Sequence, residues 1–483
     1  MSSTDQPRLT RNVELRSTSP LAVASDAAIR ASRSIRRRSW ISMRSLFRSH
    51  TKEEPTAPKS TASRGPAKGY GVLISEEFTS FTARRLDKLE TFSPAYYREM
   101  NAGQNKTMRE PSRHAVRQST RQAVQLFESD AVARALGAES WMVLPHNETS
   151  DGDTHALAAA LGTVTILVNS GGSSFTIAIA KGLARDFREI GVEVSVGNED
   201  ADPDSIGPTT LVVAPHEFFL LGRGVEWIRD PFLRGTFVYN TEQLQTPAFA
   251  RALSWVLGAK GVLDLCPQVP PILRPAGIPA IHTEPSLRYP TKWLLDDDRS
   301  HPLVQSLPAS FRASQETAWS DRPFDISFFG NESPRRDDLI SGYAARFAEY
   351  QNFIHYDRTP SPTDTGLLER IAGHVATQSR IVLNIHPDEF AYFDWHRIVG
   401  QGMASRSVVV TDHCLPHPVY KPGLHFLQTE ARDIPDLIDW VLNDAEGRAT
   451  AQQILANVDQ IASDPRGVPS GATAALRFLL DLS

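Results

Sequence analysis

The apolar positions along the chain change their spacing at about residue 163, where short apolar runs begin to alternate with amphipathic segments. Apolar runs of four to seven residues predict buried strands, and apolar positions three and four apart predict the helices between them. One alternating stretch covers 163–285 and a second covers 323–445. Alternation of this kind is typical of parallel βαβ units. We therefore predict an α/β protein with two Rossmann-like parallel-sheet domains that face a cleft.

The remaining segments lack this alternation. Residues 69–162 have helical spacing and predict a helical N-terminal extension, and 446–483 predict C-terminal helices. Residues 286–322 carry several prolines and predict an interdomain linker. Residues 1–68 are rich in Ser, Arg and Pro and carry a net charge of +9, against −14 for the rest of the chain. Such a composition predicts a disordered basic tail.

The bulk composition narrows the class of protein. With 41% hydrophobic and 22% charged residues, and no apolar run long enough to span a bilayer, the chain is expected to be soluble. Two distant cysteines favour a reducing, cytoplasmic setting over a disulfide framework. Arginines and apolar residues alternate around Trp40, which indicates either a basic amphipathic helix on the inner membrane face or a solvated tail. The acidic remainder argues against nucleic-acid binding.

Polar residues follow the predicted strands of the first domain. Gly171, Gly172 and Ser173 lie in a turn between an apolar run and a helix, where backbone N–H groups could meet an anion or a polar acceptor. The alternative is a tight turn in which serine caps the helix. His216 follows the next strand and is a candidate general base, since its pKa ordinarily lies near neutrality. Asn240, Glu242 and Gln243 come after a further strand and complete this set.

Two features of the second domain indicate an anion site. Gly330 ends a strand, and Arg335 and Arg336 open the helix after it, so dipole and guanidinium groups could together hold a pyrophosphate. A surface arginine pair is the alternative. The connection 383–413 is polar although it joins two buried strands, which predicts ligand contacts at a strand's carboxyl end. Its His386 and Asp394 could also simply cap a helix. No recognised zinc spacing occurs there.

The segments "FFGNESPRR", "RIVLNIH", "GMASRSVVVTDH" and "DIPDLIDWVLND" together resemble the C-terminal half of bacterial glycosyltransferases of the GT-B fold. The likeness is greatest to the spore-coat-associated (CgeB-like) members of the glycosyl transferases group 1. It covers about 163–445 and is strongest over 323–445. The resemblance implies a nucleotide-sugar donor held by the second domain, a glycan, lipid or protein acceptor held by the first, and sugar transfer between them. It implies no cofactor and no metal.

The resemblance also implies roles for individual residues. Gly330, Arg335 and Arg336 would approach the donor phosphates, and Asn384 with His386 would line the sugar or phosphate site. Asp394 would hold donor hydroxyls as a catalytic carboxylate, with Arg397 beside it. Gly171, Gly172, Ser173, Asn240, Glu242 and Gln243 would face the acceptor, and His216 would take its proton.

The chain departs from the family pattern at a few positions. Gln401 stands where better-known members have an acidic residue, Arg406 stands at a glycine position, and Arg397 lies eight residues after Glu389 in place of a second carboxylate. These departures support an alternative hypothesis. In it the chain is a catalytically inactive scaffold that binds a sugar or nucleotide during envelope or polysaccharide assembly.

Overall fold

The computed structural model describes residues 74–101, 108–121, 124–138, 151–204, 206–290, 292–295, 297–305, 307, 317–357, 365–463 and 471–483. All of them belong to the unit Ile41–Ser483, which is distinct from the unit Met1–Trp40. The predicted disordered tail and its amphipathic helix therefore lie outside the described residues. In the described part of the chain, no helix combines the length and apolar character needed to cross a bilayer.

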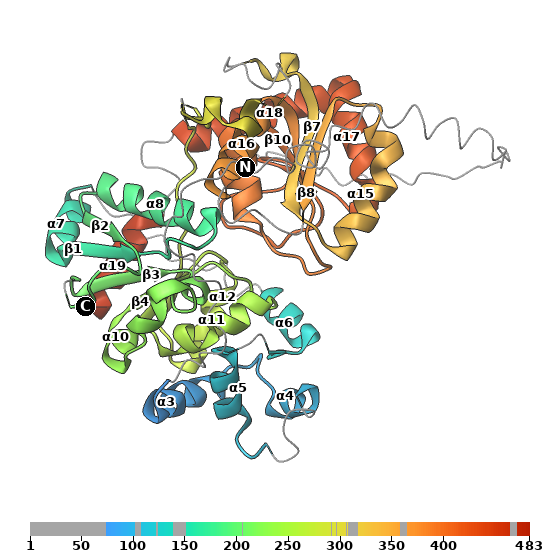
Figure 1. Cartoon of the computed structure of the whole chain (residues 1–483). Coiled ribbons are helices and arrows are strands. Elements are labelled where there is room, and N and C mark those ends of the chain that lie inside the picture. The colour runs from blue at the N-terminus through green and yellow to red at the C-terminus, as the bar shows by residue number, and fades with distance from the viewer. Residues whose placement is uncertain are drawn as a thin grey trace, which may run out of the picture. The chain divides into compact units, whose positions relative to one another are not determined.

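The segment before the first sheet is helical, as predicted. Its helices are α3 (Glu76–Leu86), α4 (Pro94–Met100), α5 (Pro111–Ser119), α6 (Ser129–Leu136) and α7 (Asp151–Leu161) (Figure 1). Ser75 caps α3, because its Oγ accepts a hydrogen bond from the Phe78 backbone N–H at 2.9 Å. The apolar faces of α3 and α5 pack against helix α11 (Pro247–Gly258) of the first domain, where Leu86, Val116 and Leu253 are fully buried. Each such side chain contributes about 1.5–3 kcal/mol of burial free energy.

The first domain contains a six-stranded sheet in which every strand pairs in parallel. The strand order is β2-β1-β3-β4-β5-β6, and the strands are β1 (Thr163–Leu167), β2 (Glu193–Gly197), β3 (Thr209–Val213), β4 (Phe237–Asn240), β5 (Gly261–Asp264) and β6 (Ala280–His282). The residues of β3, β4 and β5 are all buried, as expected of a sheet covered on both faces. The carboxyl ends of β1, β3, β4, β5 and β6 therefore meet at one edge.

Helices connect these strands. They are α8 (Ser174–Glu189), α9 (Pro215–Phe218), α10 (Asp230–Gly235), α11 (Pro247–Gly258) and α12 (Val269–Leu273), with 3₁₀ turns at Gly222–Trp227 and Arg274–Ala276. Helix α11 shows why the sequence folds in this way. Thr246 caps it, Pro247 takes the first helical position where no N–H is needed, and Leu253 and Trp255 are among its buried residues.

The second domain contains a separate parallel sheet of five strands. Its order is β11-β10-β9-β7-β8, with β7 (Phe324–Asn331), β8 (Asn352–Asp357), β9 (Ser379–Asn384), β10 (Val408–Thr411) and β11 (Leu427–Gln428). The connecting helices are α15 (Pro334–Phe347), α16 (Thr365–Thr377) and α17 (Ile434–Asn443). The segment predicted as a helix after β9 is a π-helix, His396–Gly402, followed by the 3₁₀ turn Met403–Ser405. The prediction of two Rossmann-like sheets is thus confirmed.

Short elements lie between the sheets, and two helices follow the second sheet. The short elements are the 3₁₀ turns Asp297–Ser300 and Trp319–Asp321 and helix α13 (Pro302–Gln305), and a further 3₁₀ turn is Ala431–Asp433. Helix α18 (Ala445–Ser463) packs on α17, whereas α19 (Ala472–Leu482) packs on the first domain. Phe478 of α19 makes an edge-to-face contact with Phe237 of β4 at 6.2 Å between ring centroids. The sequence predicted these C-terminal helices but not their separate partners.

Candidate functional site

Arg335 and Asp412 form the centre of the carboxyl edge of the second sheet. Arg335 opens α15, and its Nη1 donates to Asp412 Oδ2 at 2.6 Å and to the His386 carbonyl at 2.9 Å. Its Nε donates to Glu389 Oε1 at 2.9 Å. Asp412 directly follows β10, and its side chain is 3% exposed. The guanidinium group thus links the ends of three chain segments through charge-assisted bonds.

His386 is held from both sides of its ring. Nδ1 lies 2.6 Å from Asp412 Oδ1, and Nε2 lies 2.9 Å from the Tyr392 carbonyl oxygen. Both neighbours can accept a hydrogen bond, so the ring faces an acceptor at each nitrogen. Burial alone would raise the pKa of Asp412, but His386 and Arg335 outweigh it, and the pKa of that carboxyl is lowered.

Arg336 has a different environment from its neighbour. Its side chain is 2% exposed, and it donates from Nε to the Ile385 carbonyl and from Nη1 to the Asn331 carbonyl, each at 2.8 Å. Nη2 is buried and has no partner within the described ranges. Burial, reinforced by Arg397, lowers the pKa of Arg336 to about 10. The unpartnered N–H groups of Nη2 are costly to bury, and an anion could satisfy them.

Asp394 and Arg397 form the third charged group at this edge. Arg397 Nη1 donates to Asp394 Oδ2 at 2.7 Å, and Arg397 Nε donates to the Phe329 carbonyl at 3.0 Å. Burial would raise the pKa of Asp394, yet the charge of Arg397 outweighs it and the pKa is lowered. Asn384 is fully buried and donates to Thr411 Oγ1 at 3.0 Å, while its Oδ1 has no partner in the described part of the chain.

These contacts define the charge balance of the edge. Three guanidinium groups are compensated by three carboxylates, those of Asp394, Asp412 and Glu389. Asp412 is buried and the side chain of Asp394 is 11% exposed, whereas that of Glu389 is 87% exposed. An exposed ion pair is worth only about 0.2–1 kcal/mol. Glu389 can therefore leave Arg335 at little cost, and an incoming anion could take its place.

The glycine turn after β1 does not present free donors. Backbone N–H groups of Ser170, Gly171, Gly172 and Ser173 donate to Glu199 Oε2 at 2.7 Å, Asn169 Oδ1 at 2.9 Å, the Asn169 carbonyl at 3.1 Å and Glu217 Oε2 at 3.0 Å, respectively. Internal acceptors thus already bind all four groups. The N-terminus of α8 is compensated by a carboxylate of the protein itself.

Gly172 lies directly against the carboxylate of Glu217. A Cβ added at Gly172 would lie 2.5 Å from Glu217 Oε2, closer than a side chain allows. The same oxygen accepts a hydrogen bond from Thr176 Oγ1 at 2.7 Å. The sequence predicted that this glycine admits a ligand, but in the structure it admits a carboxylate from α9. A contact of Gly171, Gly172 or Ser173 with an acceptor remains a prediction.

His216 and Glu242 form a pair at the carboxyl edge of the first sheet. Ala214, at the end of β3, adopts a left-handed conformation with φ of 50° and ψ of 68°, and this turn precedes His216. Such strain in a non-glycine residue is often found at functional sites. His216 Nε2 lies 3.4 Å from Glu242 Oε1, and the side chains are 9% and 23% exposed. Glu242 is therefore the more accessible member of the pair.

The pKa values of this pair move in opposite directions. Burial, reinforced by Arg251, lowers the pKa of His216 to about 4. Burial, reinforced by Glu217, raises the pKa of Glu242 to about 7. His216 is therefore neutral near pH 7, and Nε2 is the favoured site of its proton, because Nδ1 is buried without a partner among the described residues. Glu242 exchanges its proton near neutrality.

The other two predicted acceptor residues are less accessible. Asn240 is fully buried, and its Nδ2 donates to the Glu242 carbonyl at 2.8 Å and to Asp264 Oδ2 at 2.9 Å. Its amide group stabilises the turn that carries Glu242. Gln243 is 8% exposed, and its Oε1 has no partner in the described ranges. A direct role of Asn240 toward a ligand is therefore disfavoured by its burial.

Residues from the carboxyl edges of the two sheets contact one another. The rings of Phe175, in the first turn of α8, and His396, at the start of the π-helix, lie 4.5 Å apart. Beyond β5, Gln268 Nε2 donates to the Pro416 carbonyl at 2.7 Å. Beyond β6, Glu284 Oε2 accepts from His417 Nε2 at 2.9 Å. The arginine group and the His216–Glu242 pair thus lie on edges that face each other.

His282, Glu284 and His417 could hold a metal ion by residue type, because their ligand atoms lie within 4.8 Å of one another. The hydrogen bonds do not fit this role. His417 Nδ1 accepts from the backbone N–H groups of Val419 and Tyr420, both at 3.2 Å. The proton of a neutral ring must then be on Nε2, the atom a metal would need. We interpret the cluster as a contact between the domains.

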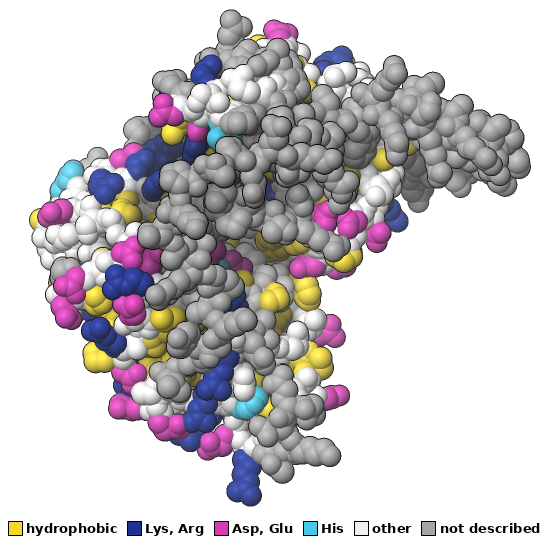
Figure 2. Space-filling model, viewed as in Figure 1, with side chains coloured by type: hydrophobic (Ala, Val, Ile, Leu, Met, Phe, Trp, Pro, Cys, Tyr) yellow, Lys and Arg dark blue, Asp and Glu magenta, His cyan; other side chains and the backbone are white. Residues whose placement is uncertain are grey.

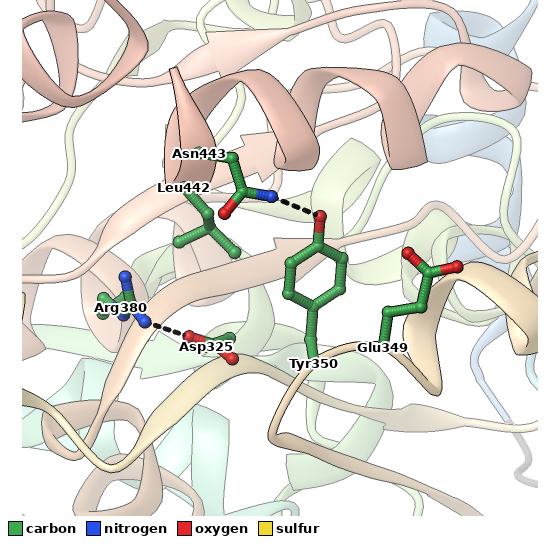
Figure 3. Close-up of a pocket in the computed structure, with 6 residues that line it drawn as sticks. All are labelled: Asp325, Glu349, Tyr350, Arg380, Leu442 and Asn443. Carbon is green, nitrogen blue, oxygen red and sulfur yellow. Dashed lines mark hydrogen bonds and ion pairs between the residues drawn. The ribbon is translucent and has the colours of Figure 1, made fainter. Parts of the chain in front are cut away.

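A hollow of about 290 Å³ lies at the opposite, amino edge of the second sheet (Figure 3). Asp325 and Arg380, which begin β7 and β9, form an ion pair in its wall. Tyr350 Oη accepts a hydrogen bond from Asn443 Nδ2 at 3.2 Å and donates to Asp439 at 2.6 Å. Ligands of open parallel sheets bind at the carboxyl edge, and this hollow lies at the other edge.

Three residues that organise these edges have no role in the predicted site: Asp412, Glu217 and Glu284. Each follows a strand closely, Asp412 after β10, Glu217 after β3 and Glu284 after β6. Their position after a strand was therefore a usable signal. What it could not indicate was the partner, since each carboxylate bonds a residue far away in the chain.

Comparisons with known proteins gave matches among solved structures. No family model matches the chain, and no curated protein matches it. Among solved structures, Anabaena HepE in complex with UDP-glucose is 12% identical with a TM-score of 0.39, over 66% of this chain and 99% of HepE. T4 phage BGT in complex with UDP and Mn²⁺ is 10% identical with a TM-score of 0.40, over 66% and 99%. An α1,3-fucosyltransferase with GDP is 10% identical with a TM-score of 0.35, over 68% and 97%.

Proposed function

We propose that this chain is a glycosyltransferase that moves a sugar from a nucleotide-sugar donor to a hydroxyl group of a glycan, lipid or protein acceptor. The observation that carries the proposal is that the carboxyl edges of the two sheets face each other and carry different chemical groups. One edge has three arginines, one of which pairs with the exposed and readily displaced carboxylate of Glu389. The facing edge has a carboxylate, Glu242, whose pKa is raised to about 7. The arginines of the first edge can bind a diphosphate, and the carboxylate of the second edge can remove the proton of a hydroxyl group.

The donor would bind at the second sheet. Its diphosphate would displace Glu389 from Arg335 and accept hydrogen bonds from the buried Nη2 of Arg336. Asp394 would accept hydrogen bonds from sugar hydroxyls, and Asn384, through its unpartnered Oδ1, could do the same. The guanidinium groups would stabilise the negative charge that develops on the leaving diphosphate. This arrangement requires no metal, and we expect a chelator to leave donor binding unchanged.

The acceptor would lie at the first sheet, next to the His216–Glu242 pair. The sequence predicted His216 as the general base, but its ring is a weak base because its pKa is about 4. We therefore assign proton removal to Glu242, with the Nε2–H of His216 orienting the carboxylate. The acceptor oxygen would bond the sugar's anomeric carbon, its proton would pass to Glu242, and the bond from that carbon to the phosphate oxygen would break.

The finer assignment to the spore-coat-associated group is also part of this proposal, and it rests on the motifs in 323–445. The proposal also includes a cytoplasmic location, with residues 1–68 in peripheral contact with the inner membrane face. Identification of the donor sugar would test whether the chain belongs to this group or to another group of glycosyltransferases. A structure with bound nucleotide would identify the contacts directly.

Calorimetric titration with UDP-, GDP- and dTDP-sugars, followed by a hydrolysis assay of those that bind, tests the proposed function. A glycosyltransferase should bind one nucleotide class and release its sugar slowly to water, and Glu242→Gln should bind it equally well but lose the release. Binding without any turnover by the natural chain would support the inactive scaffold. If the chain binds none of the three nucleotide classes, the proposal is overturned.

A further inference from the structure

A groove in the helical extension lies outside both sheets and has no part in the proposed reaction. Its volume is about 480 Å³, and it lies among α3, α4 and the start of α5. The lining residues are Ser80, Ala83, Arg84, Asp87, Pro94, Arg98, Arg109, Glu110, Pro111, Ser112 and Arg113. Figure 2 shows Lys and Arg side chains gathered low in the view, over the helices that Figure 1 labels α3 and α5. We call this feature the arginine groove.

The charges of the arginine groove are not balanced. Four arginines line it against two acidic residues. Arg113 is already neutralised, because it forms ion pairs with Glu110 and Glu76, both at 3.1 Å. Asp87 accepts a hydrogen bond from Ser112 and pairs with no arginine of the described chain. An excess of positive charge therefore remains.

The three remaining arginines, Arg84, Arg98 and Arg109, are exposed and have no ionic partner among the residues that the structure describes. Guanidinium groups that converge on one concavity repel one another, and this repulsion is relieved when a multivalent anion binds. Planar guanidinium groups also match phosphate oxygens in a bidentate geometry. The apolar side chains of Ala83, Pro94 and Pro111 provide a surface for an uncharged part of the same ligand.

We propose that the arginine groove binds a small phosphorylated molecule, with Arg84, Arg98 and Arg109 contacting its phosphate groups. The volume exceeds what a single phosphate fills, so the ligand should carry a pyrophosphate or a phosphate with a sugar-sized remainder. A membrane surface fits less well. Exposed acids on the same segment, Glu90 and Glu99, break up the positive field outside the groove.

Inorganic pyrophosphate is the probe for this site. It is titrated calorimetrically into the full chain without added nucleotide, because a nucleotide diphosphate could itself fill the groove. In the natural chain the groove should bind one pyrophosphate. In the double variant Arg84→Gln, Arg98→Gln this binding should be about tenfold weaker or absent, while any binding at the second sheet is unchanged. Arg134→Gln, an exposed arginine on α6 outside the groove, is the matched control and should bind as the natural chain does.

Unchanged binding by the double variant, or no binding by the natural chain, would overturn the proposal. A second arm uses vesicles of equal parts phosphatidylglycerol and phosphatidylcholine. If the groove arginines are needed for vesicle binding while pyrophosphate does not bind, the ligand is a membrane headgroup and the proposed soluble ligand is wrong. Thermal unfolding of each variant verifies that the helices are intact. Because only the groove arginines are changed, a loss of binding in the double variant is independent of whether the second sheet binds a nucleotide sugar.

Discussion

Glu284 Oε2 accepts a hydrogen bond from His417 Nε2 at 2.9 Å, and this bond joins the end of β6 to the segment after β10. Both side chains are buried, at 6% and 0% exposure. Burial raises the pKa of Glu284 to about 7 and lowers the pKa of His417 well below its usual value. The ring of His417 also stacks on Phe393 at 4.3 Å between centroids. A buried polar bond between the two domains is thus fixed by aromatic packing.

A double-mutant cycle measures this bond. We expect Glu284→Gln and His417→Phe each to lower the free energy of unfolding, with a coupling of about 1.5–3 kcal/mol, because a neutral imidazole donates to a charged acceptor. Urea denaturation at pH 8, above the pKa of Glu284, gives the four free energies. Additive effects of the two substitutions would contradict the bond.

Removing the exposed carboxylate beside Arg335 should strengthen donor binding. In Glu389→Gln the Arg335 Nε no longer has to leave an ion pair before it meets a phosphate. We expect the affinity for the bound nucleotide to rise about two- to fivefold, as an exposed pair of roughly 0.5–1 kcal/mol implies. Calorimetry gives the affinity. Glu446→Gln, an exposed change on α18, is the control and should have no effect.

Asp412→Asn should destabilise the second domain. The substitution leaves the Arg335 guanidinium and the His386 ring without their common carboxylate in a nearly closed site. Breaking a buried ion pair on one side costs about 3–5 kcal/mol. Urea unfolding should show this loss, whereas Glu389→Gln should change the free energy of unfolding by less than about 0.5 kcal/mol. Equal effects of the two changes would refute a central role for Asp412.

The rate of sugar transfer or donor hydrolysis should depend on the ionisation of Glu242. A carboxylate with a pKa of about 7 acts as a base only above that pH, so the rate should rise between about pH 6 and pH 8. His216→Asn removes the neighbouring Nε2–H donor, and the rising limb should move to higher pH. A pH profile unaltered by His216→Asn, or a fully active Glu242→Gln variant, would refute the assignment.

Asp264 should make the protein less stable as the pH rises. It is fully buried at the end of β5, and burial raises its pKa to about 8. A carboxyl whose pKa is raised in the folded state contributes stability below its unfolded pKa and loses it as the pH rises to the folded value, at about 1.4 kcal/mol per unit. Asp264→Asn should therefore flatten the decrease in unfolding free energy between pH 5 and pH 8. Glu242 and Glu284, whose pKa values are raised to about 7, contribute a slope of the same sign. His216 and His282, whose pKa values are lowered to about 4, contribute a slope of the opposite sign.

Strand and helix positions were predictable because hydrophobic periodicity is local. Apolar runs such as 408–411 and 261–264 are strands because both faces of a parallel sheet must be buried, and this requirement is visible in the residues themselves. The same logic located polar residues after the strands, including His216, Arg335 and His386. Helix α19 shows the limit, since its apolar face fits either domain and only packing selects the first.

The sequence by itself determined that the chain builds two parallel sheets and which polar residues stand at their carboxyl ends. The tertiary structure decided which of those residues remain accessible. It filled the glycine turn at Gly172 with the carboxylate of Glu217, buried Asn240 beneath Glu242, and placed Asp412 between Arg335 and His386. The reason is physical: periodicity is a property of neighbouring residues, whereas a buried charge must find its partner wherever the fold brings one within reach.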